Sequence, residues 1–153
     1  MNNKLSVIIV TFHSENIIEQ TIKYLLDQEI IIVDNGNNNE LKSIFNKNYP
    51  NIKYLLSKEN LGYSAGNNLG IRSASHNNIL ILNPDSIIDE KNKNELLNYI
   101  ENIKDYGILC PNLSNDQCKI FSRSNNYNPV KIDWKSIGND LVSGCALLLN
   151  KKR

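Results

Sequence analysis

Short apolar runs alternate with polar and helix-like segments along most of the chain. Six of these runs predict strands, at residues 5–12, 30–33, 52–56, 79–82, 108–110 and 145–149. Between the first five, apolar residues recur at helical spacing. They predict helices after Ser14, over residues 41–45, 63–75 and 95–103.

This alternation predicts an α/β fold of the Rossmann-like kind, with a mostly parallel central sheet and helices on both faces. Right-handed crossovers then bring the carboxyl ends of the parallel strands to one edge of the sheet. The regularity stops after Pro111, and residues 112–140 are polar and loop-like, with one short strand expected at 119–122. The length fits one domain, residues 1–153.

Composition narrows the classes of function. The chain is 41% hydrophobic and 22% charged, with a net charge of +1, so we expect no nucleic-acid partner. No apolar run is long enough for a transmembrane segment, and no secretory signal precedes the first strand. The three cysteines lack the spacing of a metal or disulfide framework. We therefore expect a cytoplasmic protein.

Polar residues follow the predicted strands, where open parallel sheets bind ligands. Asn83, Pro84 and Asp85 come directly after the strand at 79–82. A carboxylate on this rigid turn suits Mg²⁺ or Mn²⁺, which takes one or two protein carboxylates and completes its shell with phosphate oxygens and water. The alternative is a plain turn in which Asp85 accepts local backbone N–H groups.

Two further features lie at strand ends. Asp34 closes the second predicted strand, and its carboxylate either accepts the N3–H of uracil or thymine or caps the following turn. Gly62, Gly66 and Gly70 recur every four residues. They allow the backbone to approach a diphosphate or sugar, or allow a helix to pack tightly on the sheet. No Walker P-loop or G-x-G-x-x-G motif is present.

Taken in order, these segments resemble the rhamnosyltransferase-like branch of the family-two inverting glycosyltransferases. The resemblance is carried by SVIIVTF (6–12), IVDNG (32–36), NLG (60–62), AGNNLG (65–70), LILNPD (80–85) and VSGCALL (142–148). Several motifs in the family's order are more specific than any one alone. The resemblance implies a GT-A fold and a UDP- or dTDP-sugar donor.

The resemblance also implies roles for particular residues. The expected donor-binding residues are Thr11, Phe12, Asp34, Gly62, Gly66, Asn67, Asn83, Ser143 and Gly144. Of these, Thr11, Phe12 and Asp34 are expected to contact the base and ribose. Ser143 and Gly144 are expected to line the sugar or acceptor side.

Asp85 stands where the last carboxylate of the family's D-x-D motif binds the metal, Mg²⁺ or Mn²⁺. Asn83 replaces the usual first Asp, so one charge is lost and we expect a lower metal affinity. Asn67 replaces an arginine found in many relatives, which leaves the diphosphate contact open.

One part of the family pattern is missing. In relatives, a later Glu-Asp motif supplies the general base that deprotonates the acceptor, and no such motif occurs before Arg153. The catalytic residue is therefore unknown. The chain is interpreted as a fragment, a truncated product, or the partner of a second chain that supplies the acceptor side.

The leading hypothesis is a metal-dependent inverting glycosyltransferase of surface-polysaccharide assembly. Its acceptor would be a saccharide or a lipid-linked saccharide, and it would work in the cytoplasm at the inner face of the membrane. The alternative is a catalytically silent nucleotide-sugar-binding module. A sugar nucleotidyltransferase would need a Gly-rich basic loop after the first strand, which His13, Ser14 and Glu15 do not supply.

Overall fold

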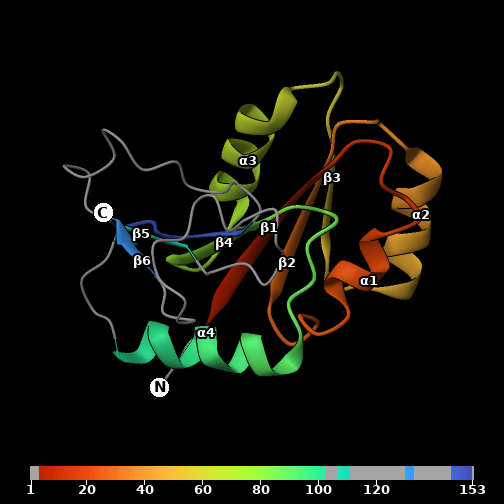
Figure 1. The fold of residues 1–153 in the computed structure, drawn as a ribbon. Coiled ribbons are helices and arrows are strands. Elements are labelled where there is room, and N and C mark those ends of the chain that lie inside the picture. The colour runs from red at the N-terminus through yellow and green to blue at the C-terminus, as the bar shows by residue number, and fades with distance from the viewer. Residues whose placement is uncertain (1–3, 103–106, 111–129, 133–145, 153) are drawn as a thin grey trace.

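The computed structural model describes residues 4–102, 107–110, 130–132 and 146–152 (Figure 1). The elements, in chain order, are β1 (Leu5–Thr11), α1 (Ile18–Ile22), β2 (Glu29–Asp34), α2 (Asn39–Asn48), β3 (Lys53–Leu56), α3 (Gly62–Ser73), β4 (Asn78–Leu82), α4 (Glu90–Asn102), β5 (Ile108–Cys110), β6 (Val130–Ile132) and β7 (Ala146–Asn150). No helix in these ranges is both long and apolar enough to cross a bilayer.

One sheet of seven strands organises the described residues, in the order β3-β2-β1-β4-β7-β5-β6. β1 is parallel to β2 and β4, and β2 is parallel to β3. β7 is antiparallel to both β4 and β5, and β5 is antiparallel to β6. The predicted Rossmann-like α/β fold is confirmed, with its parallel half built from the first four strands.

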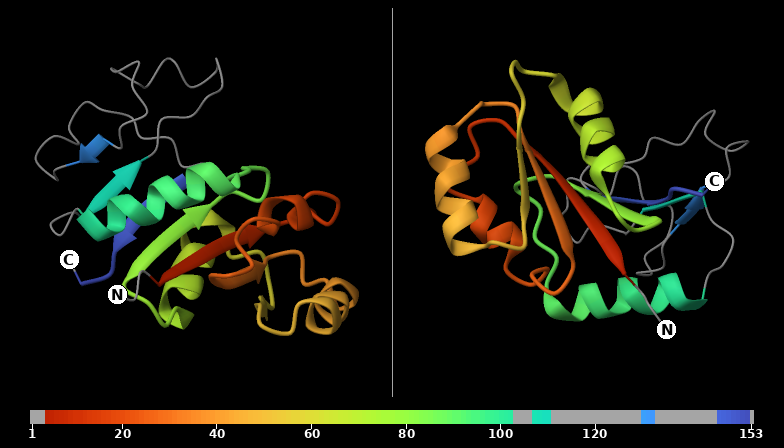
Figure 2. Two further views of the ribbon diagram at one scale, coloured as in Figure 1. Left: turned by 90° about the horizontal axis from the view of Figure 1, so that it is seen from below. Right: turned by 180° about the vertical axis from the view of Figure 1, so that it is seen from behind.

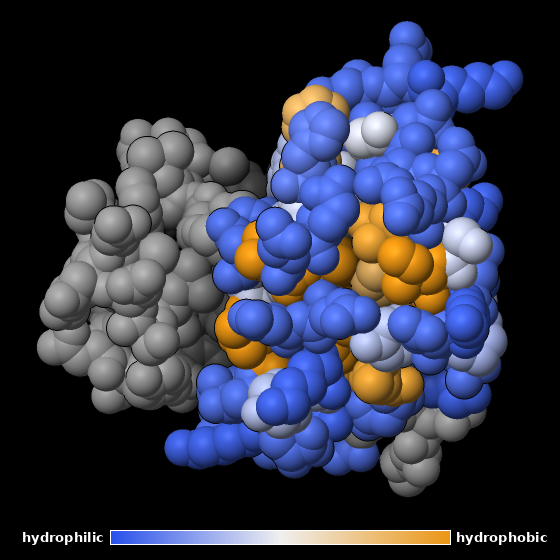
Figure 3. Space-filling view, turned by 90° about the vertical axis from the view of Figure 1, so that its right-hand side faces the viewer, coloured by the Kyte–Doolittle hydropathy of each residue, from blue (hydrophilic) through white to orange (hydrophobic). Residues whose placement is uncertain are grey.

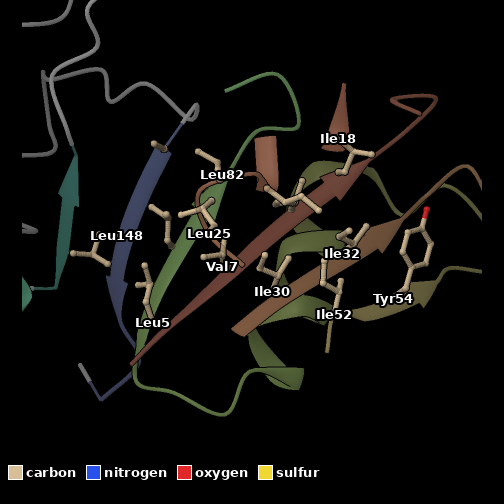
Figure 4. Packing of buried hydrophobic residues seen from close by; sticks show 14 of the residues in the cluster. Leu5, Val7, Ile18, Leu25, Ile30, Ile32, Ile52, Tyr54, Leu82 and Leu148 are labelled. Atoms are coloured by element: carbon tan, nitrogen blue, oxygen red, sulfur yellow. The ribbon is translucent and has the colours of Figure 1, made fainter. Parts of the chain in front are cut away.

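The two faces of the sheet carry separate helix layers. Alternate residues of β1 point to opposite faces, as the two-residue period of a strand requires. Leu5, Val7 and Ile9 pack in the cluster that α1, α2 and α4 cover (Figures 2 and 4). Ile8 belongs to the second cluster, against which α3 packs. Every strand residue from Leu5 to Ile9 is buried, which explains the continuous apolar run.

The surface over the α1 and α2 side is mostly hydrophilic, with separate apolar patches (Figure 3). The large hydrophobic side chains exposed in the described ranges are Phe12, Ile17, Leu26, Ile44, Tyr63 and Ile87. Scattered exposed apolar residues are normal on a folded domain, so they identify no partner by themselves.

Two helix boundaries and one strand differ from the expectation. α1 ends at Ile22 and continues as turns, although the apolar pattern runs on to Leu26. α4 begins at Glu90, earlier than predicted. The Asp89 carboxylate caps the helix there by accepting the backbone N–H of Asn92 at 2.8 Å. β6 lies within the stretch expected to be a loop, whereas the strand expected at 119–122 falls outside the described residues.

α3 lies unusually close to β1 because glycines face the strand. A Cβ atom on Gly70 would lie 2.3 Å from Ile8 Cγ2, and one on Gly66 would lie 2.9 Å from Val10 Cγ1. Gly62 differs, since its Cβ position is open and its φ of +71° favours glycine. At positions 66 and 70, the four-residue spacing therefore serves helix-to-sheet packing.

At the start of β2, Glu29 links several segments. Its carboxylate accepts hydrogen bonds from Lys53 Nζ at 2.7 Å, from the Ser75 backbone N–H at 2.9 Å and from the Ser6 hydroxyl. Burial alone would raise the pKa of Glu29, but the hydrogen bonds from Lys53, Ser6 and Ser75 outweigh burial and hold the pKa at about 2. This carboxylate is therefore a structural link between β1, β2, β3 and the α3–β4 loop.

We expect Gly70→Ala to lower the free energy of unfolding by about 1–2 kcal/mol. The clash with the stiff Ile8 side chain outweighs alanine's higher helix propensity. Urea denaturation measures the change, with the exposed Asn68→Ala on the same helix as control. A Gly70→Ala variant as stable as the wild type would contradict the close packing.

Glu29→Gln is expected to reduce stability by about 1–2 kcal/mol at pH 7. The folded-state pKa of about 2 lies below the ordinary value of 4.5, so this stabilisation is present above pH 4.5 and is lost as pH falls towards 2. Thermal unfolding of both proteins across that range should therefore converge at low pH. The exposed Glu101→Gln serves as control, and a constant difference at every pH would contradict the link.

Candidate functional site at the strand-end edge

The sheet brings the carboxyl ends of three parallel strands together. Thr11 at the end of β1 pairs with Asp34 at the end of β2, and Ile8 pairs with Ile81 near the end of β4. Because β1 lies between β2 and β4, the loops that follow these strands share one edge. We call this the strand-end edge, defined by Thr11, Asp34, Leu82 and the loops that follow them.

Asp34 is buried at this edge, with only 2% of its surface exposed. Its Oδ1 accepts the Gly36 N–H at 2.7 Å, and its Oδ2 accepts the Asn38 N–H at 3.0 Å and the Tyr54 hydroxyl at 3.1 Å. Burial, followed by the charge of Asp34, raises the pKa of Tyr54. These local contacts match the turn-capping alternative for Asp34, and its contact with a base stays a prediction.

The turn held by Asp34 also connects two neighbouring segments. Asn38 caps α2 by accepting the Leu41 N–H at 2.9 Å, and its amide donates to Glu15 Oε1 at 3.2 Å. A backbone hydrogen bond and this amide hold the pKa of Glu15 below its usual value. Asn37 has a φ of +54°, a conformation that asparagine tolerates in turns. The β2–α2 loop is thereby fixed against the β1–α1 loop.

Asn35 and Ser57 complete the edge, although neither was among the expected site residues. The buried Asn35 donates from Nδ2 to the Gly62 carbonyl at 3.2 Å. The Ser57 hydroxyl donates to the Asp34 carbonyl at 2.9 Å and lies 3.1 Å from Asn35 Oδ1. These contacts link the end of β2 to the start of α3. Ser57 directly follows a predicted strand and Asn35 lies two residues after one, so the strand-end rule applied to every polar residue would have found them.

Two polar side chains, one at this edge and one on α3, are buried without a hydrogen-bond partner among the described residues. Asn67 is 4% exposed, and neither its Nδ2 nor its Oδ1 has a hydrogen bond there. The Thr11 hydroxyl is also buried and has no hydrogen bond from the described residues. An unpaired buried polar group costs about 1–3 kcal/mol, so such groups point to a missing partner. Both residues are among the expected donor-binding residues.

Asp85 contrasts with Asp34. The Ser86 N–H donates to the Asn83 carbonyl at 3.1 Å, which closes a turn with Pro84 and Asp85 at its centre. Asp85 is exposed, and its carboxylate accepts no hydrogen bond within the described part of the chain. The backbone therefore forms the turn that was the alternative to a metal site. However, no described backbone N–H donates to the Asp85 carboxylate, as that alternative also required.

The structure describes only some of the other expected donor-binding residues. Phe12 is 51% exposed, and its ring lies 4.3 Å from the His13 ring, centroid to centroid. Ser143 and Gly144 lie outside the described residues. β7 begins at Ala146, which pairs with Leu82 beside the strand-end edge.

The amino-acid sequence matches the model of "Glycosyl transferase family 2" over residues 6–151. This chain belongs to glycosyl transferase family 2. No curated protein sequence matches it closely enough to count as a relative. The family 2 assignment agrees with the GT-A type of α/β sheet, whereas the rhamnosyltransferase-like branch stays a prediction.

Solved structures share the fold of this family 2 chain. S. aureus TarS 1–349 in complex with UDP-GlcNAc is 23% identical, with a TM-score of 0.56 over 65% of this chain and 31% of that one. The mannosyltransferase PcManGT from Pyrobaculum calidifontis, in complex with GDP-Man and Mn²⁺, is 19% identical, with a TM-score of 0.58 over 74% and 36%. The chain spans between 20% and 44% of the solved chains compared.

We expect Asp34→Asn to lower the free energy of unfolding by about 1–3 kcal/mol. The amide replaces one acceptor oxygen with a donor, so the N–H of Gly36 or of Asn38 loses its partner. Asp85→Asn is the matched control and should leave stability unchanged, because Asp85 has no such contacts. Equal unfolding midpoints for the two variants would contradict a structural role for Asp34.

Proposed function

We propose that this family 2 domain binds the donor of an inverting glycosyltransferase. The enzyme would transfer a sugar from a UDP- or dTDP-sugar to a saccharide or lipid-linked acceptor in surface-polysaccharide assembly, at the inner face of the membrane. The observation that carries the proposal is the exposed Asp85 carboxylate at the strand-end edge, to which no described residue donates a hydrogen bond. Asp34, at the same edge, is buried and fully hydrogen-bonded.

The residues at this edge fit a hard divalent cation, Mg²⁺ or Mn²⁺. The described residues hold no group of three His, Cys, Asp or Glu side chains that would enclose a metal. A single open carboxylate suits a cation that completes its shell with phosphate oxygens and water. When bound, such a cation supplies positive charge that stabilises a departing nucleoside diphosphate. Asp85 would hold it, with Asn83 beside it on the turn.

The remaining donor contacts follow from the chemistry of the edge. The exposed Phe12 ring offers a flat apolar face on which a base can stack. The amide of Asn67 and the hydroxyl of Thr11, which have no hydrogen-bond partner in the described part of the chain, offer hydrogen bonds to a polar ligand. The TarS complex with UDP-GlcNAc supports a uridine donor, and the PcManGT complex with Mn²⁺ supports a cation. We propose that Gly62, Ser143 and Gly144 contribute backbone contacts to the donor.

No residue is assigned as the general base for the acceptor hydroxyl. A module that binds a nucleotide sugar without transferring it is therefore the second candidate function. The two candidates differ in turnover, because only a transferase releases UDP or dTDP from its donor in the presence of acceptor.

Isothermal titration calorimetry with UDP and dTDP tests the proposal. We expect binding of at least one nucleotide in the presence of Mn²⁺, and we expect Asp85→Asn to weaken it about 10- to 100-fold. With EDTA, the variant and the wild type should bind equally. Glu101→Gln, which removes an exposed charge from α4, controls for net charge. If neither UDP nor dTDP binds in the presence of Mn²⁺, the proposal is refuted.

A further inference from the structure

A hydrogen bond from α1 reaches the turn that carries Asp85. Thr21 is buried near the end of α1, with 1% of its surface exposed, and its hydroxyl donates to the Pro84 carbonyl oxygen. The other acceptor within reach is the Ile17 carbonyl, one helical turn back at 3.3 Å. A hydroxyl has one proton, and the Pro84 oxygen is the closer acceptor. Figure 1 shows the loop after β4 passing beside α1.

The Pro84 carbonyl belongs to the peptide whose orientation sets the type of this turn. The Ser86 N–H to Asn83 carbonyl bond makes residues 83–86 a β-turn, in which the Pro84–Asp85 peptide is the central one. Type I and type II turns differ by a flip of this peptide, and the type II form requires a positive φ at the third residue. Asp85 is not among the non-glycine residues of positive φ in the described ranges, which are His13 and Asn37.

Holding one carbonyl oxygen therefore fixes the direction of the next residue. The peptide unit is planar, so a fixed Pro84 oxygen also fixes the bond leading to the Asp85 Cα atom. The proline ring restricts φ at position 84 and biases Asn83 towards extended backbone, but neither effect prevents the central peptide from flipping. Asp85 has no side-chain hydrogen bond of its own in the described structure, so its carboxylate follows its backbone.

We propose that Thr21 is a positioning residue for Asp85. Its hydroxyl holds the central peptide of the 83–86 turn, so that the carboxylate is already oriented before the cation and diphosphate bind. Without this bond, binding must also order the turn, and that cost weakens affinity. The inference rests on the proposed function, because it concerns how Asp85 holds the cation.

The test uses Thr21→Val, which keeps the shape of the side chain and removes the donor. We expect the apparent Mn²⁺ affinity at saturating UDP to fall about three- to tenfold, the range that one net hydrogen bond supplies. UDP affinity in EDTA should not change. Thr21→Ser retains the hydroxyl and should stay within about twofold of the wild type. Ile22→Val removes one buried methyl group from the same helix and controls for a general loss of stability.

A double-mutant cycle with Asp85→Asn separates positioning from structural damage. If Thr21 acts through Asp85, Thr21→Val has no further effect on UDP binding in Mn²⁺ when Asp85 is already replaced. An equal effect in both backgrounds, or an equal loss in Thr21→Val and Ile22→Val, would overturn the inference. If Thr21→Val does not fold, Thr21→Ala enters the same cycle.

Failure of the inference and failure of the proposed function give different results. Wild-type protein that binds no nucleotide with Mn²⁺ refutes the proposed function. Wild-type binding that Asp85→Asn weakens and Thr21→Val leaves intact refutes the positioning role alone.

Discussion

The pairing of β1 with β2 on one side and β4 on the other is the constraint on which the rest depends. Its register aligns Thr11 with Asp34 and Ile8 with Ile81. Once that register is set, the loops after three strands share one edge, and their polar residues become neighbours. A shift by one residue would turn every β1 side chain to the opposite face, so Ile8 and Val10 would lose their close packing against Gly70 and Gly66.

The carboxylates of Asp34 and Asp85 lie at the same edge but have different surroundings, and this difference gives them different roles. Asp34 ends a strand, so the tight turn after it points the N–H groups of Gly36 and Asn38 back at its oxygens. Asp85 lies within a turn in which the Ser86 N–H donates to the Asn83 carbonyl and not to the Asp85 carboxylate. One carboxylate is thereby used to build the edge, and the other is left open for a ligand.

Hydrophobic patterning predicts β1, β2 and β4 well because they are buried runs with few interruptions. It predicts the start of α4 poorly, since residues 90–94 are polar and the helix begins at a cap rather than at an apolar residue. β6 has three residues, too few to give a periodic signal. Sequence order likewise gives no sign that β7 inserts between β4 and β5 in the sheet.

The site is predictable only in part, for a related reason. Strand ends identify Asp34, Asp85 and Thr11, because parallel strands must finish at a common edge. The Thr21 bond to Pro84 joins residues that are 63 apart in sequence, and no local pattern announces it. The glycines at 66 and 70 were open to two explanations, and only the approach of Ile8 and Val10 distinguishes close packing from ligand contact.

The charges at the edge constrain how a donor would bind under the proposed function. Asn83 and Asn67 are neutral where the resemblance implies an acid and an arginine, so under this proposal a single open carboxylate, that of Asp85, holds the cation. A cation held by one carboxylate keeps more of its positive charge for the diphosphate than one held by two. The metal and the nucleotide would then each bind the protein weakly alone and more tightly when both are present. In such a site the orientation of one carboxylate governs both affinities, which is why a buried hydroxyl on α1 matters to it.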